Sequence, residues 1–169
     1  MLRRLRENGP VVLVPLAWTF ATAAHLELLA PRTVLIAHLV MDVIIAAFTV
    51  LSWREMTEGV LLVWKRVLLV GLGITLAGTG GLLADPPIDL VLTGTVVGWM
   101  LVPAAGLLAT GRLVDRRPRA YTVGGGLSVL GAVAYAGGVA GALTALIVAG
   151  LTLANVGQTA GIVAAVYDY

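Results

Sequence analysis

The chain has 169 residues, of which 59% are hydrophobic and only 12% are charged, and its mean hydropathy is +0.99. A soluble domain carries roughly 25% charged residues because water must wet its surface, so this composition excludes a soluble enzyme and predicts an integral membrane protein. The absence of cysteine excludes disulfides, thiolate metal sites and iron–sulfur clusters, and the net charge of +2 comes from bases in short loops, not from a nucleic-acid-binding stripe.

The chain divides into six apolar segments of about 20 residues, the length that an α-helix needs to cross a hydrocarbon core of about 30 Å. The predicted fold class is therefore all-α, a polytopic transmembrane helix bundle forming a single domain over residues 1–169. Only Pro31 and Arg32 separate the first two segments, so these spans are expected to form a tight hairpin. The predicted spans are residues 11–30, 33–53, 60–84, 88–110, 121–137 and 142–166.

Three segments admit more than one interpretation. Small residues at 21–24 after a basic start resemble a signal-peptide cleavage site, but the apolar run continues past them, which disfavours cleavage. Residues 54–66 mix charges with an apolar patch and are predicted to be a short interfacial helix or the extended start of the third span. From Tyr121 onward, 49 residues carry only the charge of Asp168. One helix of that length would reach about 73 Å, so a bend is predicted at the glycine-rich residues 137–141.

The basic residues predict the orientation of the chain. Alternation of the spans places ten of the eleven Lys and Arg residues on one side of the membrane and only Arg32 on the other. The positive-inside rule then predicts a multi-pass protein of the cytoplasmic (inner or plasma) membrane with both termini in the cytoplasm. The most basic loop predicts contacts with anionic lipid headgroups at Arg112, Arg116, Arg117 and Arg119.

Small residues spaced four apart predict close packing between helices, because helix backbones can approach one another where side chains are small. Glycines at 78–81 do not follow a strand, which argues against a phosphate-binding loop. The predicted packing stripes are Gly73 with Ala77 and Gly81, Gly94 with Gly98, and Gly157 with Gly161.

Ionisable residues inside the first two spans are the main candidates for a functional site. His25 and His38 each lie five residues from the outer end of their spans, about 7 Å deep. Asp42 follows His38 at i+4, so the two share a helix face, and Asp42 lies near the midplane. A carboxylate at that depth costs about 2.5 to 3.5 kcal/mol on insertion scales, so it is expected to be protonated, paired or hydrated. Asn155 in the sixth span is predicted to hydrogen-bond Asp42 or to line the same cavity.

Three functional hypotheses follow from these residues. The leading one is a small transporter or proton- or ion-translocating protein, in which Asp42 and His38 form the protonatable site, His25 lies at its outer mouth and Asn155 contributes. The second is a metal- or haem-binding redox subunit with His25 and His38 as ligands, since imidazole suits Zn, Cu and Fe. The third is a structural or anchor subunit of a membrane complex, in which the same groups form interhelical hydrogen bonds.

The remaining patterns narrow the chemistry further. A haem held between two hairpin histidines is disfavoured because packed helices lie only about 8 to 10 Å apart. An enzyme is disfavoured because the sequence contains no HExxH, GxSxG or Walker lysine motif. The residues leave the cofactor open, with no cofactor and a bound metal ion as the two alternatives. The expected partner is the lipid bilayer, with a second copy of the chain or a membrane complex as alternatives. Weaker candidates for the polar site are Tyr135, Trp99 and Thr75.

Overall fold

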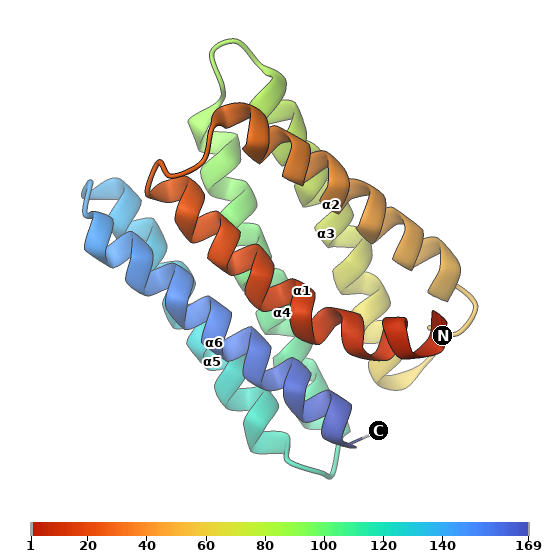
Figure 1. Ribbon diagram of the computed structural model, residues 1–169. Helices are drawn as coiled ribbons and strands as arrows, with labels where there is room; N and C mark the ends of the chain where they lie inside the picture. The colour runs from red at the N-terminus through yellow and green to blue at the C-terminus, as the bar shows by residue number, and fades with distance from the viewer. Residues whose placement is uncertain (1, 169) are drawn as a thin grey trace.

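The chain forms a bundle of α-helices joined by short turns (Figure 1). The computed structural model describes the backbone of residues 2–168 and the side chains of residues 11–166. Successive helices run in opposite directions, so α1 begins and α6 ends at one end of the bundle, which we call the termini end; the other is the far end. The helices are α1 (Leu2–His25), α2 (Pro31–Ser52), α3 (Gly59–Leu83), α4 (Asp89–Leu113), α5 (Pro118–Ala140) and α6 (Thr144–Asp168).

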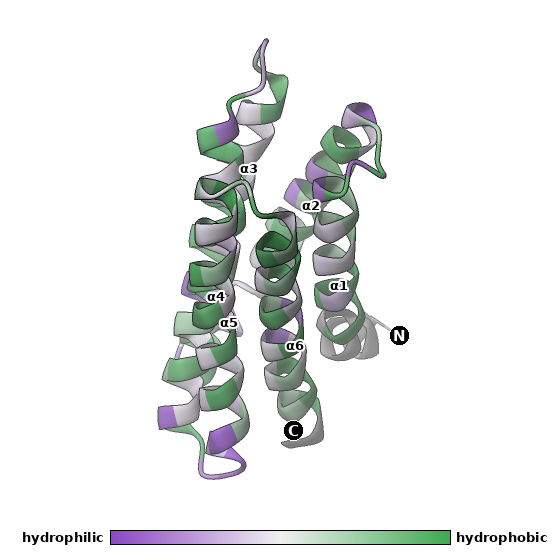
Figure 2. Ribbon diagram, turned by 90° about the vertical axis from the view of Figure 1, so that its left-hand side faces the viewer, coloured by the Kyte–Doolittle hydropathy of each residue, from purple (hydrophilic) through white to green (hydrophobic). Residues whose placement is uncertain are grey.

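Helix length and hydropathy confirm a multi-pass integral membrane protein. The helices α2 to α6 are long and apolar enough to cross a bilayer, and the apolar part of α1, Val11–His25, is shorter. Figure 2 shows hydrophobic residues along the helices and hydrophilic residues gathered mainly toward their ends. Large apolar side chains lie on the outside, for example Val50 and Leu51, each 72% exposed. Lipid is the solvent that accommodates such a surface.

The helix boundaries follow from residues that start or stop helices. Pro31 begins α2 and Pro118 begins α5, at positions where a missing N–H costs no helical hydrogen bond. α1 ends in a turn at residues 26–30, in which Glu27 adopts the left-handed conformation with φ of 58°. The connection between the first two helices is therefore residues 26–30 and not Pro31 and Arg32, because α1 ends at His25 and Pro31 already belongs to α2.

Within the segment at residues 54–66, residues 59–66 form the start of α3 and residues 54–58 form the turn before it, without a separate helix. A turn precedes Gly59, and the helix then continues without interruption to Leu83. Lys65 anchors this turn: its Nζ donates a hydrogen bond to the Trp53 carbonyl at 3.0 Å and lies 3.6 Å from the centre of the Trp53 ring. The end of α2 is thereby fastened to the first turns of α3.

The reversal between α5 and α6 lies slightly later than the sequence predicts. Gly137 and Gly138 remain helical, and the turn occupies residues 141–143, where Ala142 has φ of 51°. Gly138 serves packing instead of bending, because a Cβ there would lie 2.6 Å from the backbone nitrogen of Ile147. The glycines predicted to break the helix thus bring α5 and α6 together.

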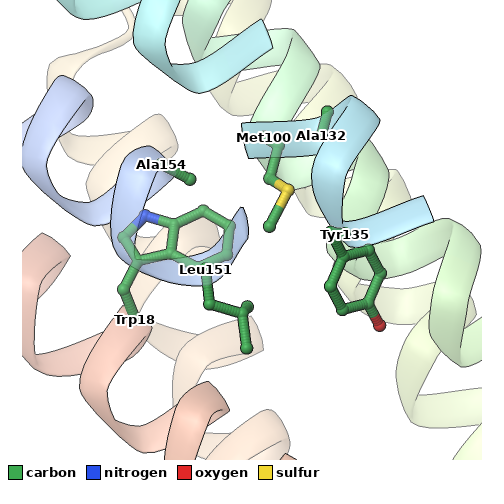
Figure 3. Packing of buried hydrophobic residues seen from close by; sticks show 6 residues of the cluster. All are labelled: Trp18, Met100, Ala132, Tyr135, Leu151 and Ala154. Carbon is green, nitrogen blue, oxygen red and sulfur yellow. The ribbon is translucent and has the colours of Figure 1, made fainter. Parts of the chain in front are cut away.

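The predicted tight hairpin of the first two spans is wrong. α1 packs on α6 and α2 packs on α3, whereas α1 and α2 share no packed interface over the residues that the structure describes. The contacts run α2, α3, α4, α5, α6, α1. Figure 3 shows why α1 turns toward α6: the Trp18 ring enters a buried cluster built by the later helices. Its members are Trp18, Met100, Ala132, Tyr135, Leu151 and Ala154.

The closest backbone approach lies between α5 and α6. A Cβ on Gly131 would lie 2.6 Å from the Gly150 carbonyl oxygen, and Gly157 packs in the same way against Gly124. The predicted packing role of Gly157 and Gly161 is confirmed, since a Cβ on Gly161 would meet the Leu107 side chain. Gly73 and Gly94, also predicted to pack, face open space.

Replacement of Gly131 tests the α5–α6 contact. We expect Gly131→Ala to lower the free energy of unfolding by about 1 to 3 kcal/mol, because the added methyl must push two helix backbones apart. Unfolding in detergent micelles followed by circular dichroism measures this change. Gly126→Ala, where a Cβ meets nothing within 4 Å, is the matched control and should be no less stable than wild type. Equal stability of the two variants would contradict the contact.

Candidate functional site

Asp42 lies at the middle of α2 and is buried against α3, with only 8% of its surface exposed. The Thr79 hydroxyl of α3 donates a hydrogen bond to Asp42 Oδ2 at 2.7 Å. Asp42 Oδ1 has no hydrogen-bond partner, and over the described side chains it is the one buried polar atom in this condition. Buried polar groups are nearly always paired, so an unpaired carboxyl oxygen marks a site that needs a functional explanation.

His38 lies one helical turn before Asp42 on the same face of α2, as the i+4 spacing predicts. The His38 ring is half-buried. Gly78 of α3 makes room for this ring: a Cβ there would lie 3.1 Å from His38 Nε2 and 2.9 Å from Thr95 Oγ1. A glycine at this position therefore lets His38 from α2 and Thr95 from α4 reach the same part of α3.

The sequence of α2 explains why these groups face inward. Its buried residues are spaced three and four apart, which places them on one helix face. The opposite helix offers small or hydroxyl-bearing residues where the two meet, including Gly78 and Thr79. The buried residues of α2 are Asp42, Ile45, Thr49 and Ser52.

His25 has different partners and does not join His38 and Asp42. Its Nδ1 lies 2.9 Å from the Ala21 carbonyl oxygen, and its Nε2 lies 2.8 Å from the Tyr135 hydroxyl of α5. Because a carbonyl can only accept, Nδ1 carries the proton and Nε2 accepts from Tyr135. The two rings meet edge to face with centres 5.3 Å apart. His25 thus ties the end of α1 to α5.

The predicted hydrogen bond between Asn155 and Asp42 is wrong. Asn155 Oδ1 accepts a hydrogen bond from the Thr159 hydroxyl at 3.1 Å within α6, while Asp42 takes its one partner from α3. The reason is the arrangement of helices, because α6 packs mainly on α5 and α1, and α2 packs on α3.

Metal ligands do not gather in the described part of the chain. No group of three or more His, Cys, Asp or Glu side chains that could hold a metal ion occurs among these residues. His25 and His38, the two predicted metal ligands, are each engaged with separate helices. The predicted headgroup contacts are exposed at the end of α4 and the start of α5, at Arg112, Arg116, Arg117 and Arg119.

A second polar network crosses the bundle and was missed in part by sequence reasoning. Trp18 Nε1 donates to Gln158 Oε1 at 3.0 Å, and Gln158 Nε2 donates to the Trp99 carbonyl at 2.9 Å. Trp99 Nε1 then donates to the Thr75 hydroxyl at 3.0 Å. These bonds link α1, α6, α4 and α3, so they hold the bundle together at the level of its core.

Thr79 is the site residue that the sequence did not single out. It lies among glycines at 78–81, where the sequence argued against a phosphate-binding loop and placed only Gly81 in a predicted packing stripe. One sequence feature could have identified Thr79: it is a hydroxyl residue beside packing glycines within a membrane span. Such a position places a hydrogen-bond donor where a second helix can approach. Comparison with family models, curated proteins and solved structures finds no match to this chain, so its function must be argued from this geometry.

Replacement of Thr79 tests its role as the partner of Asp42. We expect Thr79→Val to destabilise the protein by about 1 to 3 kcal/mol, because the buried carboxyl loses its hydrogen-bond donor. Thr79→Ser retains the hydroxyl and should recover most of this loss. Unfolding in micelles measures both variants, and a Thr79→Val protein as stable as the Ser variant would argue against the bond.

The His25–Tyr135 contact makes a separate prediction. Tyr135→Phe removes the hydroxyl and should cost about 1 kcal/mol of unfolding free energy, the size of an interhelical hydrogen bond in a membrane protein. A double-mutant cycle with His25→Phe should give a coupling energy of about 0.6 kcal/mol. Strict additivity of the two substitutions would show that the hydrogen bond contributes nothing.

Proposed function

We propose that the chain binds protons at Asp42 and moves them across the membrane. The observation that carries this proposal is the Asp42 carboxyl itself, buried in the middle of a membrane span with Oδ1 unpartnered. Ionisable groups inside membrane spans are rare because they are costly, and where they occur they commonly serve ion or proton pathways. A carboxyl oxygen without a partner is free to take up a proton.

The surroundings of Asp42 favour a proton over a metal cation. A hard cation such as Ca²⁺ takes about six to eight oxygen ligands. Asp42 accepts a hydrogen bond from one hydroxyl, that of Thr79, and no group of three or more His, Cys, Asp or Glu side chains gathers among the described residues. A proton needs only one acceptor atom, which Oδ1 supplies.

His38 is the proposed relay between Asp42 and the far end of the bundle. It stands four residues earlier in α2, so it lies about 6 Å closer to that end along the helix axis. Its ring is half-buried, and its Nε2 lies beside Gly78 of α3. An imidazole can accept a proton on one nitrogen and release it from the other.

We further propose that the termini end faces the cytoplasm. Of the basic residues whose side chains are described, Arg32 alone belongs to the far end, while seven cluster at the termini end. Such asymmetry is typical of cytoplasmic loops. Arg3, Arg4 and Arg6, which also enter the predicted orientation, lie outside the described side chains. The seven are Arg54, Lys65, Arg66, Arg112, Arg116, Arg117 and Arg119.

Proton flux in liposomes tests the proposal. The protein is reconstituted with a pH-sensitive dye inside the vesicles, and a potassium diffusion potential supplies the driving force. Wild-type protein should acidify or alkalinise the lumen faster than protein-free vesicles, and Asp42→Asn should abolish this difference because an amide does not exchange a proton at the carboxyl position.

Asp89→Asn is the matched control, since Asp89 is exposed in the first turn of α4. This variant should keep wild-type flux. Asp42→Asn protein that is folded and still conducts at the wild-type rate would refute the proposed role of Asp42. Wild-type vesicles no faster than empty ones would refute proton translocation altogether.

A further inference from the structure

The inward face of α2 continues beyond Asp42 toward the termini end. Ile45, Thr49 and Ser52 follow on the same face, and each is only 5% exposed. Two of these three residues carry hydroxyl groups, which can hydrogen-bond to the helix backbone, to a neighbouring helix or to water. Together with His38 and Asp42 they form a polar stripe along α2, interrupted at one position by Ile45.

Ile45 separates two groups of polar residues. On its far-end side lies Asp42 with the unpartnered Oδ1. On its termini-end side lie Thr49, whose hydroxyl donates to the Ile45 carbonyl at 2.7 Å, and Ser52, the last residue of α2. Met56 then closes the stripe: it is 5% exposed, and its backbone N–H donates to the Ser52 carbonyl at 3.2 Å.

The attachment of α2 bears on how this barrier can open. α3 is the helix on which α2 mainly packs, and α2 forms no extensive interface with another described helix. An element with a single packed neighbour separates from the bundle more easily than one packed on several sides. A small displacement of α2 from α3 would therefore uncover the side of Ile45 that faces Thr49.

We infer that Ile45 is the barrier between the Asp42 site and an exit lined by Thr49 and Ser52 at the termini end. This inference rests on the proposed proton translocation and assigns the route by which the proton leaves Asp42. In the structure the route is closed at Ile45 and Met56. Release toward the termini end requires α2 and α3 to part at Ile45.

Flux measurements on Ile45 variants test the barrier. Ile45→Ser should raise the rate of proton movement several-fold, because a hydroxyl and water can replace the apolar side chain. The double variant Ile45→Ser with Asp42→Asn should return to the rate of empty vesicles, since protons reach the exit only from Asp42. Ile44→Ser is the matched control: Ile44 lines an apolar groove on the outward face of α2 and should leave the rate unchanged.

Cysteine labelling tests the exit independently of flux. The chain contains no cysteine, so single-cysteine variants can be made in the native background. Thr49→Cys and Ser52→Cys should react with a membrane-impermeant methanethiosulfonate added at the termini end, and not when it is added at the far end. Val50→Cys, on the lipid-exposed surface, should react from neither side. The proposed exit would be overturned if Thr49→Cys and Ser52→Cys were labelled no faster than Val50→Cys.

The outcomes distinguish this inference from the proposed function. If Asp42→Asn abolishes flux but Ile45→Ser behaves like Ile44→Ser, proton translocation stands and the barrier is refuted. If wild-type protein moves no protons, both are refuted. If Ile45→Ser conducts faster even with Asp42→Asn, the pathway bypasses Asp42, and the assigned route is wrong.

Discussion

Close approach of helix backbones in lipid is the constraint on which this structure depends. The bilayer is as apolar as leucine, so helices gain little by hiding apolar side chains from it, and they associate through tight packing and polar bonds. Gly131 and Gly150 bring the α5 and α6 backbones together, and α4 packs against α5. Trp18 and Gln158 then attach α1 to α6. The well-packed part of the molecule is built from these contacts.

The candidate site lies where this packing is least extensive. α2 carries an ionisable group at its centre, yet it is held by α3 and not enclosed by the glycine-packed helices. A hydrogen bond from Thr79 satisfies one oxygen of Asp42 and leaves the other open. A structural role would be served better by a fully satisfied pair, because an unsatisfied buried group lowers stability. The incomplete pairing is what distinguishes this site from the His25–Tyr135 contact.

Sequence reasoning predicted the helices and singled out Asp42, but it did not predict the arrangement of the helices. The spans could be predicted because the bilayer demands a minimum apolar length, and Asp42 stood out because charge is rare in such segments. The short connection before Arg32 suggested that α1 and α2 pack together, yet side-chain shape decides helix pairing in lipid. Trp18 packs into a cluster of buried residues from α4, α5 and α6, and no local pattern reveals that contact. Asn155 and His25 were misplaced for the same reason.

The hydrogen bond from Lys65 to the Trp53 carbonyl holds the termini end of α2 against the first turns of α3. If α2 turned away from α3, it would pivot at this end, where Lys65, the single lysine of the chain, bonds the carbonyl of Trp53, the residue that follows α2. A rigid helix turning about that point moves in proportion to distance from it, and His38 is about 22 Å away while Ile45 is about 12 Å away. The same rotation therefore opens the far end nearly twice as wide as the barrier. In the proposed pathway, proton entry at the far end and release past Ile45 would therefore be unequal steps, with release the slower one.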